Sequence, residues 1–181
     1  MAITAADIKI RLSVTSGSAG NTSTSSGPAS LGKYVSTTDV PTGTNQFFNQ
    51  VTGTENAGSV TKYRCFFVYN AHATLTLMNA VVWLQGGDPA GGTAVTLAVD
   101  STPASAVGSA SAQALTAASE TAPGAPVTGL AYSAPSTSDA GLSLGNIGPG
   151  QVRAVWMKQA AQNSTAVTEA VTLAVTGSTL A

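Results

Sequence analysis

The sequence predicts an all-β protein, an antiparallel β-sandwich of the immunoglobulin-like or a related type. Apolar residues recur at every second position in several short segments, and Gly, Pro, Ser and Asn separate those segments. Only 8% of the 181 residues are charged, against about 25% in typical soluble domains. We expect an N-terminal strand followed by a polar arm or loop over residues 1–46, and the sandwich over residues 47–181. The length of 181 residues favours one compact domain overall.

The alternation is clearest in residues 7–14, where Ile8, Ile10, Leu12 and Val14 share one face of a half-buried strand. Residues 63–69 become apolar on both faces, which predicts a central strand. We expect Trp83 and Trp156 to be core residues on facing strands, because each lies in an apolar run. The other predicted strands are residues 75–84, 95–99, 127–132 (the weakest), 142–144, 152–158 and 171–175.

Two polar stretches do not follow this alternation. Residues 15–46 are rich in Ser, Thr and Gly, and they carry too little apolar surface to form a core of their own. We expect this stretch to be an extended arm that grips a partner through isolated apolar anchors. Residues 101–126 are rich in Ala and Ser and are expected to be loop or edge strand. The expected partner-contact residues are Leu31, Tyr34, Val35, Phe47 and Phe48.

The charge content excludes several classes of function. Seven Lys and Arg residues provide no basic patch for nucleic acid, and they provide no polybasic membrane anchor. The longest strongly apolar run, residues 80–84, is far shorter than the roughly 20 residues of a membrane span. The N-terminus has neither a basic nor an apolar signal region, so we expect synthesis in a cytoplasm.

Candidate catalytic residues are few. Residues 141–145 (GLSLG) match the nucleophile-elbow pattern around Ser143, but the Gly- and Pro-rich residues that follow cannot open the helix that an elbow needs. The single histidine, His72, lies in an expected turn, and the single cysteine, Cys65, lies among aromatic residues that favour a buried thiol. Zinc and calcium sites need clusters of ligands that the sequence does not provide. We therefore expect no enzyme activity, no metal and no cofactor.

Three segments carry a resemblance to a known group of proteins. Residues 63–75 (YRCFFVYNAHATL), 79–84 (NAVVWL) and 147–156 (IGPGQVRAVW) resemble structural proteins of tailed bacteriophages and prophages. The third segment is also similar to the Gly/Pro turn before a late strand in many immunoglobulin-like sandwiches. The resemblance covers about residues 45–176, and its motifs are structural.

The resemblance implies a virion component made in the bacterial host cytoplasm. The implied role is a capsid decoration (cement) protein, a homo-oligomer on the outer shell that binds and stabilises the lattice of the major capsid protein. The alternative is a virion fibre or adhesin module, in which aromatic side chains stack on host-surface glycans. An adhesin should expose a cluster of aromatic and amide side chains, whereas a decoration protein should bind assembled shells and no glycan.

Overall fold

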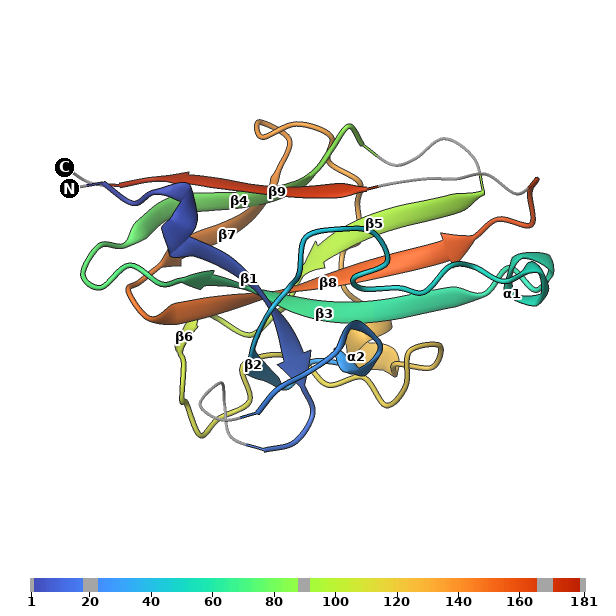
Figure 1. Cartoon of the computed structure of the whole chain (residues 1–181), viewed down its shortest axis with the longest axis horizontal. Coiled ribbons are helices and arrows are strands. Elements are labelled where there is room, and N and C mark those ends of the chain that lie inside the picture. Colours follow the sequence, from blue (N-terminus) through green and yellow to red (C-terminus); the bar gives the residue numbers. More distant parts are fainter. Residues whose placement is uncertain (1, 18–22, 88–91, 166–170, 180–181) are drawn as a thin grey trace.

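Two antiparallel sheets pack face to face in the computed structural model, which describes residues 2–17, 23–87, 92–165 and 171–179 (Figure 1). The strands are β1 (Ile8–Val14), β2 (Tyr34–Asp39), β3 (Thr61–Asn70), β4 (Leu77–Gln85), β5 (Thr93–Val99), β6 (Ser105–Ala106), β7 (Leu142–Ile147), β8 (Gln151–Ala161) and β9 (Thr172–Ser178). The helices are short: the 3₁₀ turns η1 (Ala5–Asp7) and η2 (Gly27–Ala29), and the α-helices α1 (Gly53–Ala57) and α2 (Ala125–Thr128).

The larger sheet has the strand order β2-β1-β3-β8-β5, and the two-residue strand β6 also pairs with β8. The smaller sheet has the order β7-β4-β9. Every pairing between these strands is antiparallel. The predicted all-β antiparallel sandwich is therefore confirmed, and β3 is a central strand of its sheet, as its apolar faces indicate.

The main core lies between the two sheets. Phe66 and Val68 of β3 face Val82 and Leu84 of β4, and all four side chains are fully buried. Because side chains alternate along a strand, the residues between them point to the opposite face of the larger sheet. That opposite face is also covered, which explains why β3 and β8 are apolar on both sides.

A layer of loops covers the outer face of the larger sheet. Its residues, about 101–135, bury a second cluster that contains Cys65, Phe67 and Trp156. Residues 101–126 are mostly irregular and contain the short strand β6 and the start of α2. The expected strand at 127–132 is wrong, because the short helix α2 begins at Ala125 with Pro126 in its first turn, and its Val127 is fully buried.

The stretch 15–46, where described, packs on its own domain rather than extending away from it. Residues 18–22 of the expected arm lie outside the described residues. The amide of Cys65 in β3 donates to the carbonyl of Ser30 at 2.8 Å, and the amide of Gly32 donates to Oγ of Ser13 at 2.7 Å. Strand β2 then joins the larger sheet beside β1. The two expected parts, 1–46 and 47–181, thus share one sheet.

Candidate functional site

The setting of Ser143 does not match a nucleophile elbow. Ser143 is exposed on β7, and its Oγ accepts a hydrogen bond of 3.3 Å from the amide of Gly145. A turn and the strand β8 follow β7, so the helix that an elbow requires is not formed there. The reading of residues 141–145 as a strand flanked by glycines agrees with this arrangement.

The other two candidate catalytic residues, His72 and Cys65, take part in the structure of the fold. His72 Nδ1 accepts hydrogen bonds from the amides of Thr74 and Leu75, at 3.1 and 3.0 Å, and so shapes the connection between β3 and β4. Cys65 is fully buried in β3, and burial raises the pKa of its thiol well above the usual range. Among the described residues no hydrogen bond joins Cys65, His72 and Ser143.

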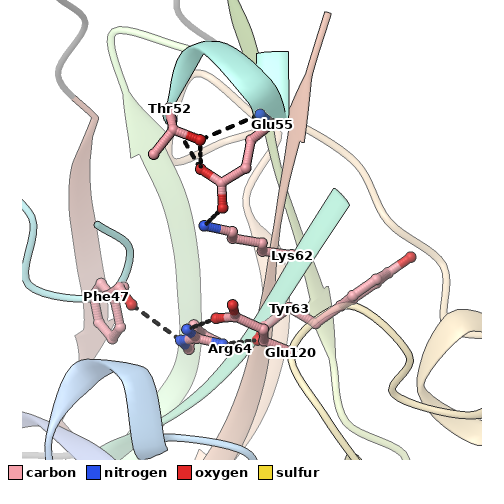
Figure 2. A network of polar contacts seen from close by, with 7 residues as sticks. All are labelled: Phe47, Thr52, Glu55, Lys62, Tyr63, Arg64 and Glu120. Atoms are coloured by element: carbon pink, nitrogen blue, oxygen red, sulfur yellow. Dashed lines mark hydrogen bonds and ion pairs between the residues drawn. The ribbon is translucent and has the colours of Figure 1, made fainter. Parts of the chain in front are cut away.

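A buried cation, Arg64, ties two loops to the end of β3 (Figure 2). Its side chain is 2% exposed and forms an ion pair with Glu120 of the loop layer. Its Nε donates to the carbonyl of Phe47 at 3.1 Å, and its Nη1 donates to the carbonyl of Tyr63 at 2.9 Å. A buried charge is tolerated only when it is paired and hydrogen-bonded, and these contacts give each of the three guanidinium nitrogens a partner.

A second ion pair, Lys62–Glu55, holds helix α1 against the same strand (Figure 2). The Lys62 ammonium and the backbone amide of Thr52 lower the pKa of Glu55 to about 2. Thr52 and Glu55 also form the capping box of α1, because the Thr52 hydroxyl accepts from the Glu55 amide at 3.2 Å. The Lys62–Glu55 pair thus stabilises α1, and both of its charged groups are engaged in these contacts.

The described residues contain no group of three or more His, Cys, Asp or Glu side chains that could hold a metal ion. At the β2 edge of the larger sheet, Asp39 accepts from Arg11 Nε at 2.9 Å, and Lys9 Nζ lies 3.9 Å from its other oxygen. Charges in this protein therefore mainly serve contacts within the chain. We therefore expect a surface for a partner among the uncharged residues.

The smaller sheet is such a surface. Strands β4, β7 and β9 contain no Asp, Glu, Lys, Arg or His. Because β4 alternates, Val82 and Leu84 point into the core while Trp83 points outward and is half-buried. We call this outer surface the Trp83 face. Its residues are Val81, Trp83 and Gln85 of β4, Ser143 of β7, and Thr172, Ala174 and Thr176 of β9.

The position of Trp83 corrects one expectation. Trp156 is fully buried, as expected, but Trp83 lies outside both core clusters. Both tryptophans lie in apolar runs, yet β8 is covered on both faces and β4 is covered on only one. The register places Trp83 opposite Ala174, whose small side chain leaves part of the indole ring uncovered.

A groove of about 450 Å³ lies beside the Trp83 face, between the edge strand β9 and strand β1. Leu173 and Val175 of β9 form one wall, and Ile8 and Ile10 of β1 form the other. These four residues belong to the main core but remain half-buried, because the sandwich is open on this side. The remaining lining residues are also uncharged: Ile3, Thr4, Ala5, Leu77, Thr176, Gly177, Ser178 and Thr179.

The five expected partner-contact residues do not gather on one surface. Val35 is fully buried under the loop layer and Phe48 is 8% exposed in the main core, so the expectation that these two are anchors for a partner is corrected. Both complete the core of their own chain instead. Leu31 and Phe47 are half-buried against those same cores, and Tyr34 is half-buried on the edge strand β2.

Sequence reasoning missed the groove and the Trp83 face. The alternation over 171–175 predicts a strand with Leu173 and Val175 facing inward, and this is what forms. Whether a strand is at the edge of a sheet depends on pairings between distant segments, and alternation does not report it. One usable signal was present, since the predicted strands at 75–84, 142–144 and 171–175, which form this sheet, lack any charge, as do those at 95–99 and 127–132.

No family model, no curated protein and no solved structure matches this chain. Within the part of the chain that the structure describes, none of the helices has the length and hydrophobicity to cross a bilayer.

Proposed function

We propose that this protein is a non-enzymatic component of a phage virion, which decorates and stabilises the outer capsid shell by binding the lattice of the major capsid protein. The observation that carries the proposal is the uncharged smaller sheet, with its half-exposed Trp83 and its open edge strand β9. The resemblance of residues 63–75, 79–84 and 147–156 to phage structural proteins supplies the biological setting.

A surface of this type supports binding to protein. Aromatic residues are enriched and charged residues depleted at the centres of protein interfaces. Trp83 lies at the middle of the Trp83 face, beside Val81 and opposite Ala174. A tryptophan in such a position commonly contributes a large share of the binding free energy.

A second function, as a fibre or adhesin module that binds host-surface glycans, is favoured by one observation. The exposed amide of Gln85 lies on the same face as Trp83, and the exposed Asn79 belongs to the same strand. An indole ring with amide and hydroxyl neighbours is suited to stack on a sugar ring and to hydrogen-bond its hydroxyls. The two functions therefore compete for one surface.

The test is co-sedimentation of the purified protein with shells assembled from the major capsid protein of the same virus, and in parallel with host-cell polysaccharide. We expect the protein to bind shells and not polysaccharide. The variant Trp83→Ala should lose about 2 kcal/mol of binding free energy, which is about a 30-fold weaker affinity. Binding to polysaccharide alone would favour the adhesin function, and binding to neither would contradict both.

The matched control is Tyr34→Ala, which removes another half-buried aromatic side chain, on the edge strand β2 of the other sheet. Because Tyr34 is not part of the Trp83 face, its removal should leave shell affinity unchanged. Loss of affinity in Tyr34→Ala with no loss in Trp83→Ala would place the contact on the N-terminal segment and contradict the proposed surface.

A further inference from the structure

The edge strands of the larger sheet and those of the smaller sheet differ in whether loops of the protein bond to them. On β2, the amide of Val35 donates to Oε1 of Gln113 at 3.1 Å, and the amide of Thr37 donates to the carbonyl of Ser23 at 2.8 Å. On β5, Leu97 and Ser133 exchange two backbone hydrogen bonds, of 2.7 and 2.9 Å. Both edges of the larger sheet are therefore capped by the protein's own loops.

The two edges of the smaller sheet differ from each other. Strand β7 is irregular, because Gly145 has a φ of +72° and the pairing of β7 with β4 shifts register on either side of Ala80. Strand β9 is regular from Thr172 to Thr176, and it contains no charged residue and no proline. Bulges, charges and prolines are the usual devices that prevent an edge strand from pairing with another chain.

Among the described residues, the backbone hydrogen bonds of β9 run to β4 alone. Its other edge borders the apolar groove, and so do Leu173 and Val175. Across the groove, the start of β1 has backbone partners already, because the carbonyl of Ile10 accepts from the amide of Val40 at 2.7 Å and the amide of Ile8 donates to the carbonyl of Ala5. An added strand would therefore pair with β9 and contact β1 through side chains. The sandwich thus has a place for one more strand between β9 and the start of β1.

We infer that this groove is the docking site for one extended segment of another protein chain, which pairs with β9 as an added strand. The segment has apolar side chains at every second position, because Leu173, Val175, Ile8 and Ile10 line the space that they would fill. It has no charge on that side, because all the lining residues are uncharged and would leave a buried charge unpaired. This inference deepens the proposed function, under which the segment belongs to a neighbouring virion subunit.

The form of the groove favours a single segment over a second copy of this chain. Residues 3–5 line the groove together with Gly177, Ser178 and Thr179, and the N-terminus lies beside the end of β9 (Figure 1). A second copy would have to bring its whole sheet past this N-terminal wall to align two β9 strands. One added strand needs only the spacing of about 4.8 Å between neighbouring strands.

The experiment uses a synthetic peptide of alternating valine and threonine, with a lysine at each end, and amide hydrogen exchange of the full-length protein. We expect the peptide to slow exchange in β9 by about tenfold or more, since an edge amide gains a hydrogen-bond partner. A peptide of the same composition with the valines grouped at one end should have no effect. If amide exchange in β9 is not slowed, or if both peptides slow it equally, the inference is overturned.

The variant Val175→Lys places a charge in the groove and should abolish the peptide's effect on β9. The matched control Thr172→Lys adds the same charge to the exposed outer face of the same strand and should retain the effect. If exchange in β8 shows that Val175→Lys is unfolded, Ile8→Lys tests the opposite wall. An effect that survives the groove variants overturns the inference.

Sedimentation of the protein without peptide completes the test. A dimer in which β9 is already protected would assign the groove to a second copy and overturn the inference. Failure of the peptide together with normal shell binding would overturn this inference alone. Failure of both would overturn the proposed function as well.

Discussion

The indole nitrogen of Trp156 donates a hydrogen bond of 2.7 Å to Oδ2 of Asp100, and both side chains are buried. The same carboxylate oxygen accepts from the amide of Leu115 at 2.8 Å. Asp100 follows β5, Trp156 lies in β8 and Leu115 lies in the loop layer. One carboxylate therefore fastens the irregular layer to the larger sheet, without contact with the Trp83 face.

Truncation of Trp156 should be among the most destabilising changes in this protein. Trp156→Ala is expected to lower the free energy of unfolding by about 3–5 kcal/mol, the range for large aromatic residues in cores. Trp156→Phe retains most of the packing but removes a hydrogen bond to a charged group, with an expected cost of about 1.5–3 kcal/mol. Urea denaturation measures both, and a cost below about 0.5 kcal/mol for Trp156→Phe would contradict the role assigned to Asp100.

Gly32 should not tolerate a side chain. Its φ is +90°, and a Cβ atom there would lie 2.0 Å from the carbonyl oxygen of Leu115 and 2.9 Å from Cζ2 of Trp156. Gly32→Ala should therefore destabilise the fold by about 1–3 kcal/mol or more, through overpacking and backbone strain. Gly53→Ala is the control, because a Cβ at Gly53 meets no atom within 4 Å. Equal thermal stability of the two variants would show that the loop layer is not packed as described.

Stability in acid should depend on Glu55. Its pKa in the folded protein, about 2, is lower than the ordinary value of 4.5. Glu55 therefore contributes to the free energy of unfolding above about pH 4.5, and this contribution is lost as the pH falls towards 2. Glu55→Gln should remove this part of the acid dependence and lower stability at neutral pH. Asp139→Asn, a change at an exposed carboxylate, is the control. Denaturation midpoints from pH 6 to pH 2 that fall equally in Glu55→Gln and the wild type would refute this role.

Binding of the protein to its partner should change little with salt. Ionic strength screens exposed ion pairs strongly, but it has a weak effect on apolar contacts and backbone hydrogen bonds. The smaller sheet contributes only such contacts, since β4, β7 and β9 carry no charge. Shell affinity measured from low to high salt should stay within about threefold. Release of the protein by a modest rise in salt would indicate an ionic interface elsewhere.

Local alternation was enough to predict most of the strands. It places Ile8–Val14, the core of β3 and β8, and β9 correctly, because each buries a distinct face. It missed β2, whose residues Ser36 to Thr38 are polar. The amide of Val35 in that strand bonds to Gln113, a residue far away in the sequence. No window of neighbouring residues contains that information.

Local alternation also does not predict whether other parts of the chain cover the outer face of a strand. Trp83 and Trp156 have similar neighbours in the sequence, but only Trp156 lies beneath the loop layer. The same holds for residues 15–48, whose few apolar side chains resemble isolated anchors until Val35 and Phe48 are seen in the cores. In both cases the answer depends on hydrogen bonds and packing between distant segments.

The most direct test of the proposed docking surface is amide hydrogen exchange of the free protein compared with the protein on assembled shells. We expect exchange in β9 to be slowed on shells, because its open edge and the adjoining groove become covered. We expect exchange in residues 23–46 to be equal in the two states, since this segment already packs on its own domain. Strong protection of residues 23–46 on shells with no change in β9 would contradict the proposed surface and restore the N-terminal segment as the gripping element.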